Sequence, residues 1–448
     1  MKYHKLICLF LVFAPFIFTI NLSAQNPLIM DQFTADPTAR VFEGKIYVYP
    51  SHDIIASKGK GRVGWFCMED YHVFSSENLT DWQDHGVIAS QNNVSWVTSN
   101  SYSMWAPDCI FRNGKYYFYF PAPAKDTTYG RGFSIGVAVS DKPYGPFIPQ
   151  SEPIKNVHGI DPNIFIDRDG QAYLYWAGRG MSVAKLKENM LEIAEKPQVI
   201  EGLPKGFKEG PFLFERKGIY YFTFPFVIDT TESLAYCTSD NPMGPFKYGG
   251  IMMDKSPTGC WTNHQSVVEY KDQWYLFYHH NDLSPEFDKA RSIRADSLFF
   301  NEDGTIKKVI PTLRGIGITK AESKIQIDRY SAISKGGVSI AFLNKEKRSE
   351  GWKINLNEKD TWVQYNSVDF GNNNLKAVNV RATSATGGLI DIRLDKIDGP
   401  LLAQIEIGKD SEWKITNSKL INVPSGLHNL VVFQKEKNNV DLDWISFE

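Results

Sequence analysis

The segment GIDPNIFIDRDGQAYLYWAG, residues 159–178, carries the pattern that decides the fold. A run of β-branched and aromatic residues follows Asp161-Pro162, a turn with Asp and Gly interrupts it, and an aromatic run then surrounds Tyr173. Two such runs separated by a tight turn are typical of a β-hairpin. The segment therefore predicts two antiparallel strands that begin just after an acidic residue.

The same pattern recurs along the chain. The other copies are RVFEGKIYVYP, CIFRNGKYYFYFP, FLFERKGIYYFTFP and VVEYKDQWYLFYHH, and the tyrosines after the five turns are Tyr47, Tyr117, Tyr173, Tyr221 and Tyr275. Each unit has a second hairpin pattern, most clearly in GVAVSDKPYGPF and LAYCTSDNPMGPF. Two hairpins make a four-stranded blade, and five blades close into a β-propeller. The sequence thus predicts an all-β fold.

The last part of the chain departs from this repeat. Short alternating segments such as TWVQYNSVDF and LIDIRLDKI follow one another from about residue 322. Short alternating strands with frequent turns favour a β-sandwich, here of jelly-roll type. We therefore expect a propeller over residues 25–320 and a β-sandwich over residues 321–448.

Residues 1–24 have the features of a secretory signal peptide. Lys2 and Lys5 precede an apolar run over residues 6–20, and Leu22-Ser23-Ala24 resembles a cleavage site. A membrane anchor is the alternative, but the run is short for a span. We expect a secreted or periplasmic protein that has no membrane span after cleavage.

The net charge and the cysteine content limit the kinds of ligand that the chain is expected to bind. The net charge of −2 provides no basic field for nucleic acid, so a neutral substrate is expected. Four cysteines remain after the signal peptide, and they show no metal-binding spacing. We expect buried free thiols, with a disulfide as the alternative in an oxidising compartment. These cysteines are Cys67, Cys109, Cys237 and Cys260.

Chemically active residues fall at one position of the repeat. Asp36 lies 11 residues before its turn tyrosine, Asp161 and Glu209 lie 12 before theirs, and His264 lies 11 before Tyr275. Trp105 and Ala106 occupy this position in the second unit. This position opens the innermost strand of each blade, and those strands start at one face of a propeller. Three carboxylates and a histidine are thus expected to converge.

Converging carboxylates suit the hydrolysis of a glycosidic bond. Mutual repulsion raises at least one pKa, which provides a protonated acid for the leaving oxygen beside an ionised partner. Carboxylates on opposite sides of a channel leave room for a water molecule, which predicts inversion. The alternatives are turn caps for the acids and a buried core role for His264. A channel lined by acids could also hold Ca²⁺ near His264.

With these residues in place, the chain resembles glycoside hydrolase family 43. The matching motifs are ADP at 35–37, MWAPD at 104–108, residues 159–178, KEGPFLF at 208–214, NHQSVVEY at 263–270 and RSIRADSLFFNEDG at 291–304. The NDPNG, RDP and EC motifs of fructan-cutting propellers are absent. The resemblance implies Asp36 as general base, Glu209 as general acid and Asp161 as the residue that sets the pKa of the acid. It also implies His264 as the central histidine near a bound Ca²⁺, Arg291 in contact with the base or the substrate, and Trp105 near the sugar subsite.

The C-terminal part resembles carbohydrate-binding module family 6. The matching pieces include residues 350–371 and VDLDWISFE at 440–448. The resemblance implies that Trp352 and Trp413 hold a sugar between them, with core packing as the alternative for each. Asp441 stands where the family usually has Asn. A purely structural role for the module is therefore a second interpretation.

These resemblances imply a secreted inverting glycoside hydrolase that acts on plant cell-wall polysaccharide. The arrangement favours an exo-acting α-L-arabinofuranosidase on arabinoxylan or arabinan. A β-xylosidase and a non-catalytic carbohydrate-binding propeller are the alternatives. The chemistry requires no cofactor, and a structural Ca²⁺ is the single ion expected.

Overall fold

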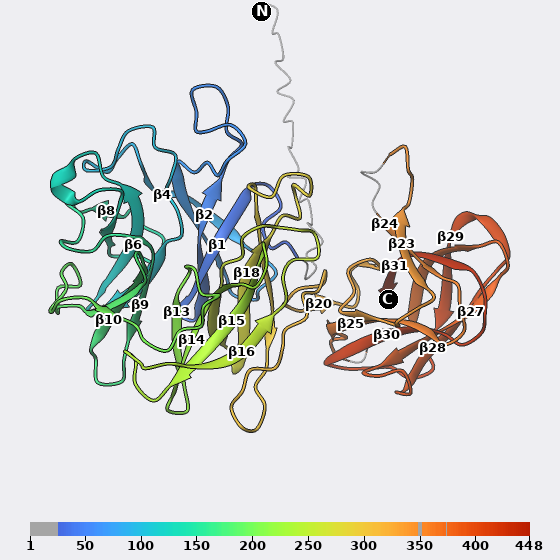
Figure 1. Ribbon diagram of the computed structural model, residues 1–448. Helices are drawn as coiled ribbons and strands as arrows, with labels where there is room; N and C mark the ends of the chain where they lie inside the picture. The colour runs from blue at the N-terminus through green and yellow to red at the C-terminus, as the bar shows by residue number, and fades with distance from the viewer. Residues whose placement is uncertain (1–25, 348–351, 373) are drawn as a thin grey trace, which may run out of the picture.

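The computed structural model describes residues 26–347, 352–372 and 374–448, and those residues fold almost entirely into β-strands. The predicted signal peptide lies outside them. Within the described residues the only helical turn is η1 (Thr127–Tyr129). A larger domain with radial sheets and a smaller two-sheet domain lie side by side (Figure 1). The predicted all-β class is confirmed.

Four of the propeller sheets contain four antiparallel strands each. The first is β1 (Phe33–Phe42), β2 (Lys45–Asp53), β3 (Asp70–Ser76) and β4 (Gln83–Ser90); the second is β5 (Asp108–Arg112), β6 (Lys115–Pro123), β7 (Phe133–Ser140) and β8 (Ile148–Pro149). The third is β9 (Ile160–Ile166), β10 (Ala172–Ala177), β11 (Met181–Lys185) and β12 (Gln198–Val199); the fourth is β13 (Phe212–Arg216), β14 (Ile219–Val227), β15 (Glu232–Ser239) and β16 (Lys247–Met253).

The fifth sheet differs from the predicted four-stranded blade. It contains β17 (Ser266–Tyr270), β18 (Gln273–His280) and β19 (Ser292–Leu298). Of the second hairpin expected here, the first strand forms as β19, but the residues after it make only an isolated bridge between Phe300 and Ile306. The chain before β1 instead binds the free edge of β19, where the Leu28 amide donates to the Ile293 carbonyl and the Ala295 amide donates to the Asn26 side chain. The first and last blades are thereby joined.

The first strand of every blade faces the centre. Strand β1 contacts β5 and β17, and the contacts of β9 with β5 and β13 and of β13 with β17 complete the circle. Apolar residues fill the space between blades; Tyr175 of β10, for example, packs against Phe222 of β14. Five short inner strands therefore surround one axis, as a five-bladed propeller requires.

Two sheets form the C-terminal β-sandwich, as predicted. One contains β20 (Thr319–Lys320), β25 (Thr361–Asp369), β30 (Leu427–Gln434), β27 (Gly388–Leu394) and β28 (Leu401–Ile407), with β22 (Ala332–Ile333) beside β25. The other contains β23 (Val338–Phe342), β24 (Trp352–Leu356), β31 (Val440–Phe447), β26 (Ala377–Ser384) and β29 (Asp410–Lys419), with β21 (Ile325–Gln326) beside β31. Residues such as Val363 and Val380 fill the core between the sheets.

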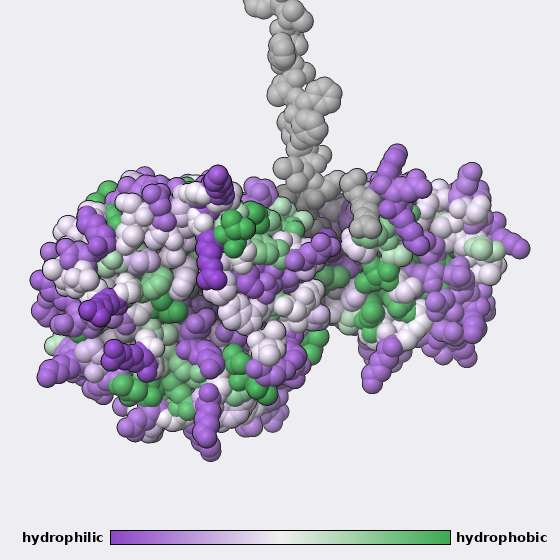
Figure 2. Space-filling view, turned by 45° about the horizontal axis from the view of Figure 1, so that its top comes forward, coloured by the Kyte–Doolittle hydropathy of each residue, from purple (hydrophilic) through white to green (hydrophobic). Residues whose placement is uncertain are grey.

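The two domains meet over a short junction, visible as two lobes in Figure 2. Strand β20 already pairs with β25, so the sandwich begins at Thr319, slightly before the predicted boundary. The buried Arg314 side chain donates from Nε to the Asn366 carbonyl at 2.7 Å, and Arg329 donates to the Asn26 carbonyl at 3.2 Å. Direct hydrogen bonds thus link the domains.

Two further observations concern the whole chain. Cys67, Cys109, Cys237 and Cys260 are buried free thiols, as the sequence predicts. Across the described ranges, no helix has the length and apolar character needed to cross a membrane.

Candidate active site

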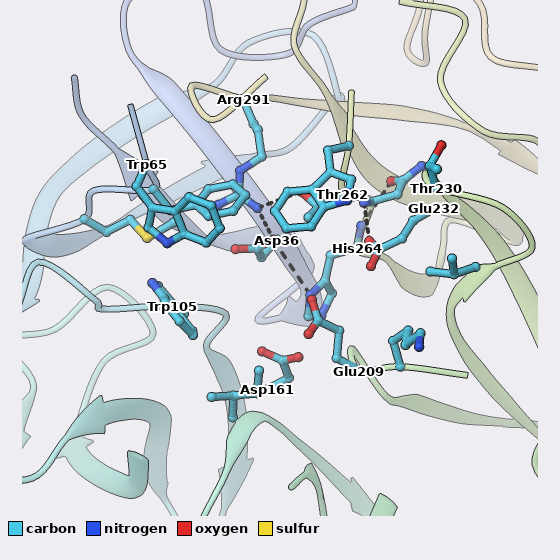
Figure 3. A pocket seen from close by; sticks show the side chains of 17 residues that line it. Asp36, Trp65, Trp105, Asp161, Glu209, Thr230, Glu232, Thr262, His264 and Arg291 are labelled. Atoms are coloured by element: carbon cyan, nitrogen blue, oxygen red, sulfur yellow. Dashed lines mark hydrogen bonds and ion pairs between the residues drawn. The ribbon is translucent and has the colours of Figure 1, made fainter. Parts of the chain in front are cut away.

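One pocket of about 410 Å³ opens where the inner strands begin. This volume lies within the usual range for a small-molecule site. Figure 3 shows Asp36, Asp161 and Glu209 around a common space, with Trp105 at one side. The pocket is lined by all six propeller residues singled out from the sequence: Asp36, Trp105, Asp161, Glu209, His264 and Arg291.

The backbone at the start of three inner strands is left-handed. The φ angles are 47° at Asp36, 57° at Asp161 and 63° at Gly210, and each of these residues precedes a proline. Such values are uncommon for Asp and are often found where a side chain must be aimed into a site. A register shift in β1 and another between β9 and β10 accompany the two aspartates. Glu209 directly precedes Gly210 in the sequence, and it lines the pocket from this position.

Asp36 is held as an anion. Arg291 Nη1 donates to Asp36 Oδ1 at 2.8 Å, and the Ser51 hydroxyl donates to Oδ2 at 2.8 Å. Burial alone would raise the pKa of Asp36, but the charge of Arg291, aided by nearby histidines, lowers this pKa to about 2. Asp36 is therefore ionised at any ordinary pH and can accept a proton from water.

Arg291 is itself fixed by a residue that sequence analysis missed. Its Nε and Nη2 donate to the two carboxylate oxygens of Asp53 at 2.8 and 2.9 Å. A bidentate pair of this kind fixes the plane of the guanidinium. Asp53 ends β2, on the strand next to Asp36, and its burial raises its pKa. Asp53 thus positions the cation that keeps Asp36 ionised.

The pKa values of Glu209 and Asp161 are shifted upward, opposite to the pKa of Asp36. Burial raises the pKa of Glu209, and the negative charge of Asp36 adds to this effect. The positive charges of Arg291 and Lys208 act in the opposite direction and lower this pKa. Burial is also the main cause of the raised pKa of Asp161, and the negative charges of Glu209 and Asp36 raise this pKa further. Asp161 Oδ2 accepts from the Gly210 amide at 2.9 Å, directly beside Glu209. These upward pKa shifts favour a proton at this side of the pocket over one at Asp36.

His264 lies beside Asp36, with Nδ1 3.8 Å from Asp36 Oδ1. Burial lowers its pKa, so the imidazole is neutral and able to bind a cation. A Ca²⁺ ion takes six to eight oxygen ligands, whereas His264 offers one nitrogen, and the metal-ligand cluster found among the described residues is a different one, His52, Asp70 and His72. The side chains around His264 alone supply too few ligands for a calcium cage.

Aromatic side chains line the mouth of the pocket. The Trp105 ring stacks on Phe133 with centroids 4.5 Å apart, and Phe66 stacks on Trp261 at 6.0 Å. Trp65 also lines the cavity and contacts Trp261. Broad apolar ring faces beside carboxylates suit the alternating apolar and hydroxyl surfaces of a sugar.

Glu232 is a fourth pocket acid that sequence analysis missed. It opens β15, the third strand of its blade, and therefore lies outside the repeat position used to find the others. Its Oε2 accepts from the Asn263 amide at 2.7 Å. Burial, with the charge of Glu209, raises its pKa to about 8. Figure 3 shows it across the pocket from Trp105.

In the sandwich, Trp352 and Trp413 are not brought into one pocket. Trp352, on β24, is 40% exposed and stacks on Phe342 at 3.9 Å. Trp413, on β29, lies 5.1 Å from the Arg381 guanidinium and lines a separate hollow with it. Strands β31 and β26 lie between β24 and β29. Three strand spacings amount to about 14 Å, so the two tryptophans start from well-separated strands.

Asp441, at the position where the sequence departs from the family pattern, is already engaged. Its carboxylate pairs with Lys353 at 2.6 Å and accepts from Asn355 at 2.8 Å. These contacts tie β31 to β24 and occupy both oxygens of the carboxylate.

Two family models match the chain. Residues 24–306 match glycosyl hydrolases family 43, and residues 331–448 match carbohydrate binding module (family 6). The first match spans well over half of the sequence, and the second coincides with the sandwich.

Known proteins with similar sequences or structures are also glycoside hydrolases. Xylosidase/arabinosidase 43A of Humicola insolens is 37% identical in an alignment that covers 62% of this chain and 98% of that protein. An arabinoxylan arabinofuranohydrolase of Paenibacillus polymyxa is 27% identical in an alignment that covers 90% of this chain and 71% of that protein. The crystal structure of a β-xylosidase/α-arabinofuranosidase from a compost metagenome, complexed with xylotriose, matches 64% of this chain and 98% of its own with a TM-score of 0.57 and 35% identity.

Proposed function

The chain belongs to glycosyl hydrolases family 43, and from this membership we propose that it is an inverting, exo-acting α-L-arabinofuranosidase that releases arabinose from arabinoxylan or arabinan. Its class as a glycoside hydrolase follows from the family and its relatives. One observation carries the mechanism: two acids of one pocket, Asp36 and Glu209, have pKa values displaced in opposite directions. That division is the one a general base and a general acid require.

In the proposed reaction, a water molecule attacks the anomeric carbon as the bond to the leaving oxygen breaks. Asp36 accepts the proton that the water loses, and Glu209 gives its proton to the leaving oxygen. One C–O bond forms and one breaks, and the configuration of the anomeric carbon inverts. Asp161, beside Glu209, keeps the proton on the acid before the bond breaks.

The choice of arabinose rests on the domain arrangement. The Paenibacillus polymyxa relative, named an arabinoxylan arabinofuranohydrolase, aligns with 90% of the chain, including the sandwich. A β-xylosidase is the second candidate, because the Humicola insolens relative is named for both activities and the compost enzyme was crystallised with xylotriose. In both cases the proposed partner is a plant cell-wall polysaccharide or its oligosaccharides.

A non-catalytic carbohydrate-binding propeller is disfavoured by the same chemistry. A binding protein has no need for three buried carboxylates that repel one another, since burying such groups costs free energy of folding. Secretion through a cleaved signal peptide at residues 1–24 remains part of the proposal. A structural Ca²⁺ is a separate proposal, which chelation of the purified protein followed by a stability measurement tests.

The direct experiment compares substrates. Purified protein is incubated with 4-nitrophenyl α-L-arabinofuranoside, 4-nitrophenyl β-D-xylopyranoside and wheat arabinoxylan, and the released sugars are identified by chromatography. Arabinose from the furanoside and the polymer is the expected product. Xylose as the main product would replace the first candidate by the second. The absence of any release from folded protein would contradict both.

A further inference from the structure

A second groove continues from the catalytic pocket. It has a volume of about 750 Å³ and shares Trp105, Ile160, Lys208 and Glu209 with that pocket. Beyond these shared residues it is bordered by Arg131 and Arg179, which do not line the catalytic pocket. A ligand can therefore occupy both cavities at once.

The groove carries an unbalanced positive charge. Arg131, Arg179 and Lys208 are three cations, and Glu209 is the one carboxylate in its lining, so the sum is +2 even when Glu209 is ionised. In the described part of the chain, the charged ends of these three residues make no hydrogen bond or ion pair. Two other arginines of the propeller are paired, Arg112 with Glu188 and Arg168 with Glu215.

The position of Glu209 determines which part of a substrate reaches the groove. A general acid protonates the leaving oxygen, so it stands between the sugar that is released and the part that leaves. Glu209 lines both cavities. The released sugar thus belongs in the catalytic pocket, and the remainder of the polysaccharide extends along the groove.

We propose that this groove binds a carboxylate on the leaving-group side of the substrate, namely a uronic acid residue of a branched plant polysaccharide. The inference rests on the proposed function and deepens it. Arginine suits this ligand because its planar fork can give two parallel hydrogen bonds to a carboxylate. The stacked rings of Trp105 and Phe133 provide an apolar face for the sugar ring that carries it.

The test compares two matched oligosaccharides. One is a neutral arabinoxylo-oligosaccharide, and the other is the same molecule with one glucuronic acid on the xylose chain. We expect kcat/KM of the wild type to be about 3- to 10-fold higher for the acidic substrate in dilute buffer. We expect this preference to fade in 0.5 M NaCl, because salt screens exposed charges. An arabino-oligosaccharide that ends in galacturonic acid shows whether a pectic uronic acid serves equally well.

The variant R131Q/R179Q removes two cations without touching the catalytic pocket. It should abolish the preference for the acidic substrate, with a smaller change in kcat/KM for the neutral oligosaccharide than for the acidic one. The double variant K217Q/K247Q removes two exposed charges that line neither cavity and should behave as the wild type.

The outcomes separate the two proposals. Equal rates on acidic and neutral substrates, or a preference that survives R131Q/R179Q, would overturn the uronic acid site while the hydrolase assignment stands. No hydrolysis of the aryl glycoside or of the neutral oligosaccharide would instead contradict the proposed function itself.

Discussion

At the scale of single residues, Arg291 is the charge that separates the acids of the site. It lies 2.8 Å from Asp36, and Asp53 fixes its orientation. Without this cation, burial would favour the protonated form of Asp36 as it does for Glu209 and Asp161. The difference in pKa between Asp36 and the other two acids therefore depends on the guanidinium of Arg291.

We predict that R291Q moves the acid limb of the pH–kcat/KM profile upward. In the proposed mechanism activity requires ionised Asp36, so it should fall as the pH drops through the pKa of that group, about 2 in the wild type. With the cation removed, burial raises this pKa, and the acid limb should enter the range of pH 4 to 6. R291K, which keeps the charge, is the matched control. An unchanged acid limb in folded R291Q would contradict the assigned role of Arg291.

The raised pKa of Glu232 predicts a specific pH dependence of stability. The folded protein holds this proton up to about pH 8, whereas the unfolded chain releases it near 4.5. The folded state thus binds more protons between these values, and this group makes stability fall as pH rises through that window. In E232Q this fall should be reduced by up to about 1.4 kcal/mol per pH unit. Urea unfolding at pH 5, 6.5 and 8 measures the effect, and parallel curves for both proteins would refute it.

Sequence analysis located the acids that share a repeat position but not the residues that support them. Asp36, Asp161 and Glu209 stand 11 or 12 residues before a turn tyrosine, which is a signal a single sequence can carry. Glu232 and Asp53 come from the third strand of one blade and the second strand of another. Their approach to the pocket depends on how blades pack, and no local pattern records it.

At the scale of secondary structure elements, the left-handed residue before each proline aims the acids. Gly210 has this conformation in the fourth blade, and its amide donates to Asp161. A Cβ at Gly210 would lie 2.6 Å from Pro225 Cδ. The backbone that presents Glu209 therefore has no space for a larger residue.

We predict that G210A lowers stability by about 1–3 kcal/mol and reduces kcat at least tenfold, because the left-handed strain and the contact with Pro225 displace Glu209. G218A in the same blade is the control. Gly218 has a φ of 84°, but a Cβ there meets nothing within 4 Å, so only the strain remains and activity should persist. Thermal unfolding and kinetics of both variants check this. Equal loss of kcat in the two would contradict the steric argument.

The fifth blade shows where a repeat in the sequence misleads. Residues 291–306 resemble the second hairpin of the other blades, but beyond β19 they form one bridge, between Phe300 and Ile306. The N-terminal segment binds the edge of β19 and fills part of the missing place. A pairing between the two ends of a domain carries no signal in either segment alone.

At the scale of the whole molecule, the sandwich is fastened to the propeller, so any sugar it binds is held near the catalytic domain. Arg314 is buried at the junction, and burial lowers its pKa to about 10. It donates to the backbone of residues 366 and 367 in the sandwich. Such attachment would raise the local concentration of polymer at the active site.

We predict that W413A weakens retention on insoluble arabinoxylan by several-fold and leaves kcat/KM on the soluble aryl glycoside unchanged. Trp413 lines an open hollow with Arg381, where a sugar ring can stack. W352A is the paired variant, since Trp352 instead packs against Phe342. Pull-down with the washed polymer measures retention. Unchanged retention in W413A would support a structural role for the module.

The protonation of the leaving oxygen by Glu209 is the central claim, and leaving-group dependence tests it most directly. The kcat/KM of wild type and E209Q is measured on a series of arabinofuranosides from 2,4-dinitrophenyl through 4-nitrophenyl to methyl. A good leaving group needs no proton, so the loss in E209Q should be small for the first and rise to about 10³-fold or more for the last. A loss that is equal across the series, or no loss for the methyl glycoside, would contradict the account.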